Sequence, residues 1–212
     1  MRKYLIGAAL AALAAVGVAM AQVNTVPQVG LITSYLKNST YASTTLALAP
    51  ASSATDVACI SGSTTREVHL TRIAISGTAG TLVTLPVTLL LRHSLDTGGT
   101  AGTTTANWAN NKAPLNTSDV ASTATLISYS ANPTITDTSP TYIRTGVISL
   151  NTTAALVAAP PLTWLFGNPV NVFDKEPTIP AATTVVKQFC LNFNGVSVST
   201  GVLNLDVEWQ EK

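Results

Sequence analysis

The sequence contains few charged and few aromatic side chains. Asp, Glu, Lys and Arg together make up 10% of the 212 residues, and Phe, Trp and Tyr make up 6%. Beyond Arg2 and Lys3, the nine remaining Lys and Arg residues are scattered singly, whereas nucleic acids and anionic membranes attract clusters of basic side chains. The composition therefore excludes nucleic acid as a partner, and it predicts no membrane partner once a signal peptide has been cleaved.

Motifs that would indicate catalysis or metal binding are also missing. The two histidines, His69 and His93, have no partner at zinc-ligand spacing, and no H-x-x-x-H or C-x-x-C sequence occurs. There is no G-x-S-x-G nucleophile motif. Asp206 and Glu208 share one face of a predicted strand, but a carboxylate pair alone does not define a glycosidase. We therefore expect a protein that is not an enzyme, that uses no cofactor and that has no recognisable metal site.

Calcium is the one ion that the sequence leaves open. Asp96, Asp119 and Asp137 lie in expected loops, where carboxylates can converge with backbone carbonyls on Ca²⁺. No D-x-D-x-D-G loop supports such a site.

The N-terminus has the pattern of a secretory signal peptide. Arg2 and Lys3 precede an apolar run over residues 4–20, which ends in the small-x-small sequence A-M-A. An uncleaved membrane anchor is the alternative, because a run of this length just reaches what a bilayer requires. The expected organisation is a hydrophobic N-terminal helix acting as signal peptide (1–21), an N-terminal segment or arm (22–53) and a β-sandwich domain (54–212).

Hydroxyl side chains are abundant, with 50 Ser and Thr residues in all. Threonine favours strands, and the apolar residues beyond the N-terminal run alternate with period two and show no helical period. About seven to nine short strands separated by polar turns predict an all-β fold, an antiparallel two-sheet β-sandwich of jelly-roll or immunoglobulin-like topology.

The phase of the alternation predicts local detail in two places. Val68 and Ile73 fall on opposite phases, so a β-bulge near Thr71 and Arg72 is needed to bring both to the core. The stretch 188–209 contains two alternating segments around a turn and predicts a closing hairpin. The strands expected from the alternation and the turn residues cover residues 66–76, 83–91, 123–131, 143–150, 163–166, 170–173, 184–194 and 202–209.

The two cysteines, Cys59 and Cys190, are disulfide candidates in an oxidising compartment. Cys190 falls on the opposite strand face from Phe189 and Leu191, so it lies either outward or in a bulge. The spacing alone does not decide whether the two cysteines pair.

A long polar connection, residues 96–119, is a candidate binding loop. It is rich in Gly, Thr and Asn and is longer than a hairpin needs, and long loops on rigid β folds often carry recognition. An exposed Trp108 beside Asn107 and Asn110 would stack on a sugar ring or anchor a partner. The alternative is that Trp108 folds back and caps the edge of the sandwich.

Five sequence segments, taken in order along the chain, resemble those of a known protein family. The segments are ATDVACISGSTTREVHLTRIAISGTAG, LLLRHSLDTGGTAG, STATLISYSANPT, LTWLFGN and FCLNFNGVSVSTGVLNLDVEW. Together they resemble a family of small β-rich virion structural proteins of tailed bacteriophages and prophages, over roughly residues 54–209. The resemblance implies a β-sandwich capsid decoration protein or a head or tail accessory protein. The export signal departs from that pattern, because phage particles assemble in the cytoplasm.

These observations lead to two hypotheses of different classes. The first is a non-enzymatic structural protein that acts by self-association or by docking on a larger particle, with itself or other virion or surface subunits as partners. Such a protein is located in the virion if it is phage-encoded and is otherwise exported. The second is a secreted bacterial surface protein that binds glycans or cell surfaces through residues 96–119.

Overall fold

The computed structural model describes residues 39–152, 159–167, 175–182, 186–198 and 200–212. All of them belong to one compact unit, Asn38–Lys212. The expected signal-peptide helix (1–21) and the expected strand at 170–173 lie outside the described residues. Within those ranges, no helix is long and apolar enough to cross a bilayer.

The described chain is nearly all β, and its single helical segment is the short 3₁₀ turn η1 (Trp108–Asn110). The alternating apolar and polar pattern therefore predicted the fold class correctly. The strands are β1 (Ser39–Leu48), β2 (Ala54–Ser61), β3 (Val68–Ala79), β4 (Val83–Arg92), β5 (Thr100–Ala101), β6 (Ala113–Pro114), β7 (Thr125–Ala131), β8 (Thr141–Thr152), β9 (Leu162–Leu165), β10 (Thr178–Ile179), β11 (Gln188–Val196) and β12 (Val202–Glu211).

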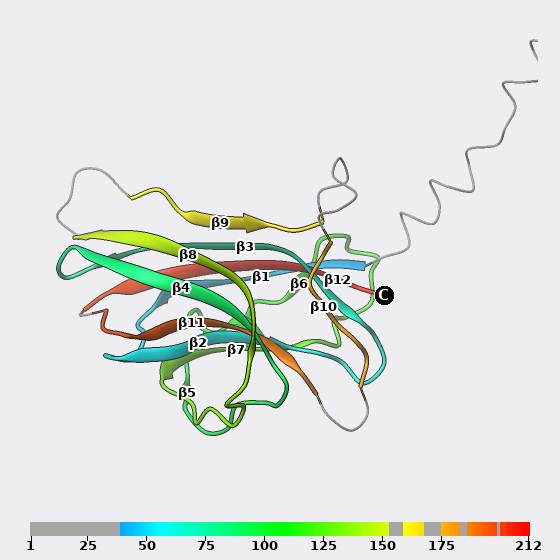
Figure 1. Cartoon of the computed structure of the whole chain (residues 1–212). Helices are drawn as coiled ribbons and strands as arrows, with labels where there is room; N and C mark the ends of the chain where they lie inside the picture. The colour runs from blue at the N-terminus through cyan, green and yellow to red at the C-terminus, as the bar shows by residue number, and fades with distance from the viewer. Residues whose placement is uncertain (1–38, 153–158, 168–174, 183–185, 199) are drawn as a thin grey trace, which may run out of the picture. The chain divides into compact units, whose positions relative to one another are not determined.

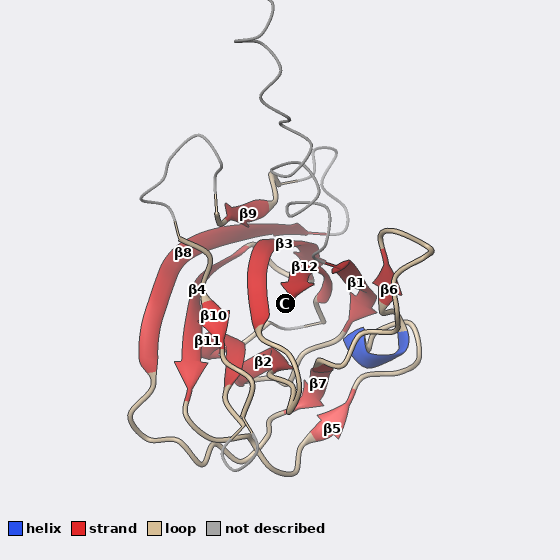
Figure 2. Cartoon of the chain, turned by 90° about the vertical axis from the view of Figure 1, so that its right-hand side faces the viewer, coloured by secondary structure: helices blue, strands red, loops and turns tan. Residues whose placement is uncertain are grey.

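The strands form one curled, mixed sheet in the order β5-β7-β2-β11-β4-β8-β3-β12-β1-β6, with β9 and β10 paired to β3 (Figures 1 and 2). Strand β8 connects the two halves of the curled sheet, because it pairs with a strand on each side. It pairs antiparallel with β4 along most of its length, and at its C-terminal end it pairs parallel with β3. The other strand pairings in the described chain are antiparallel.

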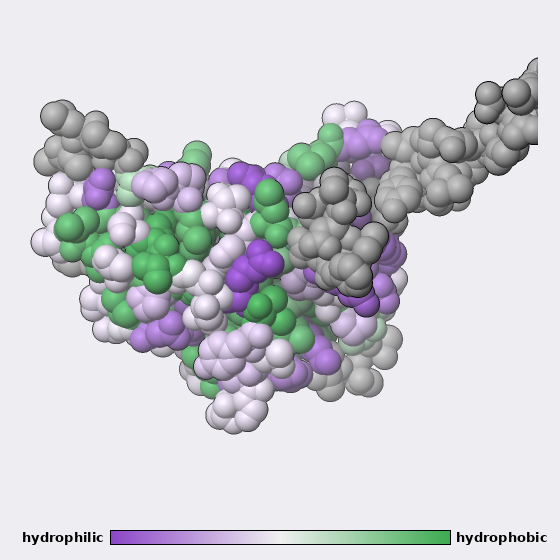
Figure 3. All heavy atoms as spheres, turned by 45° about the horizontal axis from the view of Figure 1, so that its top comes forward, coloured by the Kyte–Doolittle hydropathy of each residue, from purple (hydrophilic) through white to green (hydrophobic). Residues whose placement is uncertain are grey.

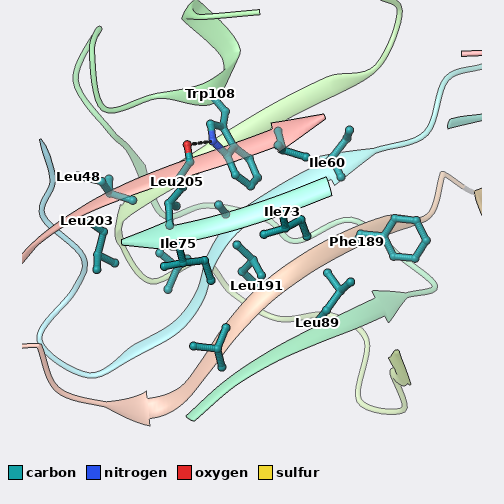
Figure 4. Close-up of a cluster of buried hydrophobic side chains, with 14 of the residues drawn as sticks. Leu48, Ile60, Ile73, Ile75, Leu89, Trp108, Phe189, Leu191, Leu203 and Leu205 are labelled. Atoms are coloured by element: carbon teal, nitrogen blue, oxygen red, sulfur yellow. Dashed lines mark hydrogen bonds between the residues drawn. The ribbon is translucent and has the colours of Figure 1, made fainter. Parts of the chain in front are cut away.

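The inward-facing apolar side chains of the curled sheet meet in one core (Figure 4). Leu85, Val87 and Leu89 of β4 form an inward row, as their alternation predicts. Phe189 and Leu191 of β11 are also buried, as are Leu203, Leu205, Val207 and Trp209 of β12. Each buried aliphatic or aromatic side chain of this kind contributes about 1.5–3 kcal/mol of transfer free energy, so the core is the main stabilising element of the domain.

The predicted bulge at Thr71 is confirmed. Leu70 pairs with Trp209 and Arg72 pairs with Glu208, so Thr71 is the extra residue of β3. The bulge shifts the phase of the strand and allows residues on both sides of it to face the core.

The predicted closing hairpin is wrong, although both of its strands exist. Strand β11 pairs with β2 and β4, whereas β12 pairs with β3 and β1. Residues 197–201 therefore connect two separate parts of the sheet. The alternation predicts which face of a strand is buried, but it does not identify the neighbouring strand.

The β domain also begins earlier than the expected boundary at Ala54. Strand β1 (Ser39–Leu48) lies in the segment expected to be an arm, and it pairs with β12 from Ser39↔Glu211 to Leu48↔Leu203. Its Tyr41 is fully buried and stacks on Trp209, with ring centroids 5.6 Å apart. The C-terminal part of the segment 22–53 is thus an integral strand of the sheet.

Candidate functional site

Trp108 is buried, so the expectation of an exposed indole is wrong. Only 1% of its surface is accessible, and its Nε1 donates a hydrogen bond to the carbonyl of Leu205 (2.9 Å; Figure 4). Its backbone N–H donates to Ser128 Oγ (3.2 Å), and its carbonyl accepts from Ser43 Oγ (2.7 Å). The alternative, in which Trp108 folds back onto the sheet, describes the structure.

The neighbouring asparagines explain how the loop turns inward. Asn107 is the N-cap of η1, and its side-chain oxygen accepts from the N–H of Ala109 (3.1 Å). Asn107 is buried, whereas Asn110 is exposed. Of the three residues expected to form a binding surface, only Asn110 is available to a ligand.

Cys59 and Cys190 form a disulfide. They lie directly opposite each other in the register of β2 and β11. Cys190 points away from the face of Phe189 and Leu191, as its phase predicts, yet both cysteines are fully buried. A second, small cluster made of the two cysteines and Tyr129 lies on this side of the sheet.

A buried charged network surrounds the disulfide on the same side of the sheet. Arg92 binds Asp56 through two donors, Nε to Oδ2 and Nη2 to Oδ1, the latter at 2.8 Å. Arg92 Nη1 also donates to the carbonyl of Asp137 (3.1 Å). Asn192 of β11 donates its side-chain N–H to the same Asp56 carboxylate. Bidentate pairing of this kind compensates the charges of Arg92 and Asp56 in a buried site.

Asp96 is the exceptional member of this network. Its side chain is inaccessible to solvent, its Oδ1 has no hydrogen-bond partner, and the nearest cationic atom, Arg92 Nε, is 3.9 Å away. Its Oδ2 lies 3.6 Å from the sulfur of Cys59 and 3.9 Å from that of Cys190. Burial, reinforced by the neighbouring Asp56 carboxylate, raises the pKa of Asp96 to about 7. The same burial and the two carboxylates raise the pKa of Tyr129 to about 12.

The alternation of apolar and polar residues did not predict the buried charged network, because a β-bulge in β2 determines which side chains share a face. Leu191 pairs with Ala58, but Asn192 pairs with Asp56, so Val57 is an extra residue in β2. This places Asp56 on the same side as Cys59, although three positions separate them. An acidic residue close before a cysteine in an apolar strand was the available signal.

The aspartates considered as calcium ligands are not gathered. In the part of the chain that the structure describes, the cluster of metal-capable side chains consists of Asp56, Cys59, Asp96 and Cys190. Asp137 instead accepts from the backbone N–H of His93. Asp96, Asp119 and Asp137, which the sequence left open as calcium ligands, therefore do not form one cluster in the described part of the chain.

The opposite side of the domain presents a broad surface that we call the outer β face. It is the outward side of four adjacent strands, β1, β12, β3 and β9. Its charged side chains are all bonded, since Arg72 binds Glu208 (2.9 Å) and Thr44 donates to Asp206, and the face carries one net negative charge. A hollow of about 240 Å³ opens on it beside Asn111. Its side chains, by register and alternation, are Ala42, Thr44, Leu46, Arg72, Ala74, Ser76, Thr163, Leu165, Asn204, Asp206 and Glu208.

No protein-family model matches the sequence, and no curated protein matches it.

Proposed function

We propose that this protein is a non-enzymatic structural component of a phage or prophage virion that acts by self-association or by docking on a larger particle. The observation that carries this proposal is the outer β face. Eight of its eleven side chains are uncharged by their type, and the remaining three are Arg72, Asp206 and Glu208. A surface of small, hydroxylated and aliphatic side chains loses little hydration free energy when another subunit covers it.

Exposed aliphatic side chains support the same proposal. Leu46 of β1 and Leu165 of β9 lie on strands at opposite margins of the outer β face and are 56% and 63% exposed. Apolar and weakly polar residues cover much of the described surface visible in Figure 3. Aliphatic groups at the margins of a neutral surface are typical of an interface that is covered in an assembly.

The proposal also includes the topology of the β fold and the cellular location of the protein. We infer that the curled sheet works as a two-sheet sandwich of jelly-roll or immunoglobulin-like topology, since β11 and β12 bury apolar rows in one core while pairing with different strands. We infer a virion location if the chain is phage-encoded and export otherwise. Mass spectrometry of the native protein distinguishes the two, because export gives a chain that starts at Gln22 and assembly inside the cell leaves Met1 in place.

Sizing of the purified protein over a range of concentrations, together with negative-stain imaging, tests the proposal. We expect concentration-dependent assembly. Thr163→Glu, which adds a further negative charge at an exposed position of a face that already carries one Arg and two carboxylates, should weaken it. Thr84→Glu, at an exposed position of β4, is the matched control and should leave assembly unchanged. A protein that stays monomeric at high concentration and is missing from purified particles contradicts the proposal.

Glycan or cell-surface binding through residues 96–119 is the alternative. Its main aromatic contact is removed by the burial of Trp108. The proposal therefore does not use this loop as a binding surface.

A further inference from the structure

Four potential metal ligands meet on the buried side of β2 and β11, away from the outer β face. One donor atom from each of Asp56, Cys59, Asp96 and Cys190 lies within 4.8 Å of all the others. In the oxidised protein the two sulfur atoms share a bond, so neither is a thiolate. Metal binding by cysteine requires the thiolate.

The position of Asp96 fits a shared metal ion. Two donors on one tetrahedral zinc, with Zn–S of about 2.3 Å and Zn–O of about 2.0–2.2 Å, lie roughly 3.6 Å apart. Oδ2 of Asp96 lies 3.6 Å from the sulfur of Cys59 and 3.9 Å from that of Cys190. The carboxylate is therefore already placed at the sulfur-to-oxygen separation of such a site.

Asp96 is also the member of the network whose bonding is incomplete. Its side chain is fully buried and its Oδ1 has no hydrogen-bond partner. A buried carboxylate with incomplete hydrogen bonding is costly, and a cation bound at its Oδ2 would offset the charge of the group as a whole. Asp56, in contrast, is held by Arg92 and Asn192.

We propose that reduction of the Cys59–Cys190 disulfide creates a binding site for a thiophilic divalent cation such as Zn²⁺, with Cys59, Cys190 and Asp96 as ligands. Asp56 lies within reach of the fourth position, and a water molecule is the other candidate for it. The charge of two thiolates and one carboxylate exceeds that of the ion by one. Arg92 lies 3.9 Å from Asp96 but is already paired with Asp56, so the occupied site together with this pair carries one net negative charge.

The chemistry balances with an external reductant. A dithiol transfers two electrons and its own two protons to the disulfide, and is itself oxidised to a disulfide. A phosphine supplies two electrons and takes up the oxygen of one water molecule to become the phosphine oxide, and the two protons of that water complete the two thiols. Binding of Zn²⁺ then releases both thiol protons to solvent.

Titration of the reduced protein with Co²⁺ tests the site. The disulfide is reduced with a phosphine under mild denaturation, complete reduction is checked by counting thiols, and the protein is returned to native buffer with Co²⁺. We expect one Co²⁺ per chain, with the visible absorption of tetrahedral cobalt and a sulfur-to-cobalt charge-transfer band, and displacement by Zn²⁺. The oxidised protein and the Cys59→Ser/Cys190→Ser variant should give neither band.

The role of Asp96 has its own control. Asp96→Asn should weaken Co²⁺ binding at least about tenfold, which corresponds to about 1.4 kcal/mol, whereas Asp119→Asn should leave it unchanged. If the reduced protein does not fold without metal, addition of Co²⁺ should restore its β-sheet circular dichroism. Reduced protein that takes up no Co²⁺, that fails to refold with it, that binds one ion between two chains, or that binds equally well as Asp96→Asn overturns the proposal. None of these outcomes bears on assembly through the outer β face.

Discussion

The indole Nε1 of Trp209 donates a hydrogen bond to the carboxylate of Glu211, two residues further along β12 (3.1 Å). The same buried carboxylate accepts from the backbone N–H groups of Thr123 and Ala124 and from the hydroxyls of Ser122 and Thr123. Burial opposes ionisation of Glu211, but these hydrogen bonds outweigh it and lower its pKa. The last strand is thereby tied to the segment that leads into β7.

We expect Glu211→Gln to lower the free energy of unfolding by about 2–3 kcal/mol at neutral pH, because the neutral amide loses the charge-assisted bonds and turns an N–H₂ group toward other donors. Urea denaturation measures the change. Glu208→Gln, on the outer β face, is the matched control. Its half-exposed pair with Arg72 predicts an effect below about 1 kcal/mol.

The same residue predicts an acid dependence. Since the pKa of Glu211 is lower in the folded state, its contribution is complete above the ordinary value of 4.5 and is lost as the pH falls through the folded pKa. The stability of the wild-type protein should therefore fall more steeply in acid than that of Glu211→Gln. If the free energy of unfolding falls equally steeply with decreasing pH in the two proteins, the Glu211 carboxylate does not make the hydrogen bonds described.

Asp96 predicts the opposite dependence. Its folded pKa of about 7 lies above the ordinary value of 3.8, so between these values the folded state holds a proton that the unfolded state has lost. Its contribution to stability should decrease as the pH rises from about 4 to about 7 and stay constant above that. We expect Asp96→Asn to be more stable than wild type at pH 8 and nearly equal to it at pH 4. Thermal unfolding over this range measures the difference, and Asp119→Asn should follow the wild-type curve throughout.

The sequence predicted strand phase better than strand partners. The rows Leu85-Val87-Leu89 and Leu203-Leu205-Val207 face the core as expected, because burial of alternate side chains is a local property of a strand. The hairpin of β11 and β12 was wrong, because pairing depends on where the connection 197–201 leads the chain. Alternation carries no information about that path.

The buried network shows a second limit. The bulge at Thr71 could be predicted, since Val68 and Ile73 are both apolar and out of phase. The bulge at Val57 could not, because Val57 and Ala58 are both apolar and neither reveals a change of phase. Asp56 therefore looked unrelated to Cys59 in sequence, and the cluster with Asp96 is formed only by the fold.

Removal of the disulfide should destabilise the domain without changing its core. The bond joins residues 131 positions apart, and the chain-entropy model gives an upper value of about 4–5 kcal/mol for a loop of this length. We expect Cys59→Ala/Cys190→Ala to lower the free energy of unfolding by about 2–4 kcal/mol in chemical denaturation. A loss below about 1 kcal/mol would indicate that the buried network alone holds β2 against β11.

Trp108 should behave as a core residue and not as a ligand contact. Its indole is buried, and Nε1 bonds to the Leu205 carbonyl, so Trp108→Ala should cost about 3–5 kcal/mol of stability. Trp108→Phe keeps most of the apolar volume but leaves the buried carbonyl without its donor, and the expected loss is about 1–3 kcal/mol. Asn110→Ala, at the exposed end of η1, is the control and should change stability by less than about 0.5 kcal/mol. Equilibrium denaturation followed by tyrosine fluorescence or far-UV circular dichroism ranks the three variants.

A Trp108→Ala protein as stable as wild type would mean that the indole does not occupy the core. Residues 96–119 would then again be a candidate binding loop.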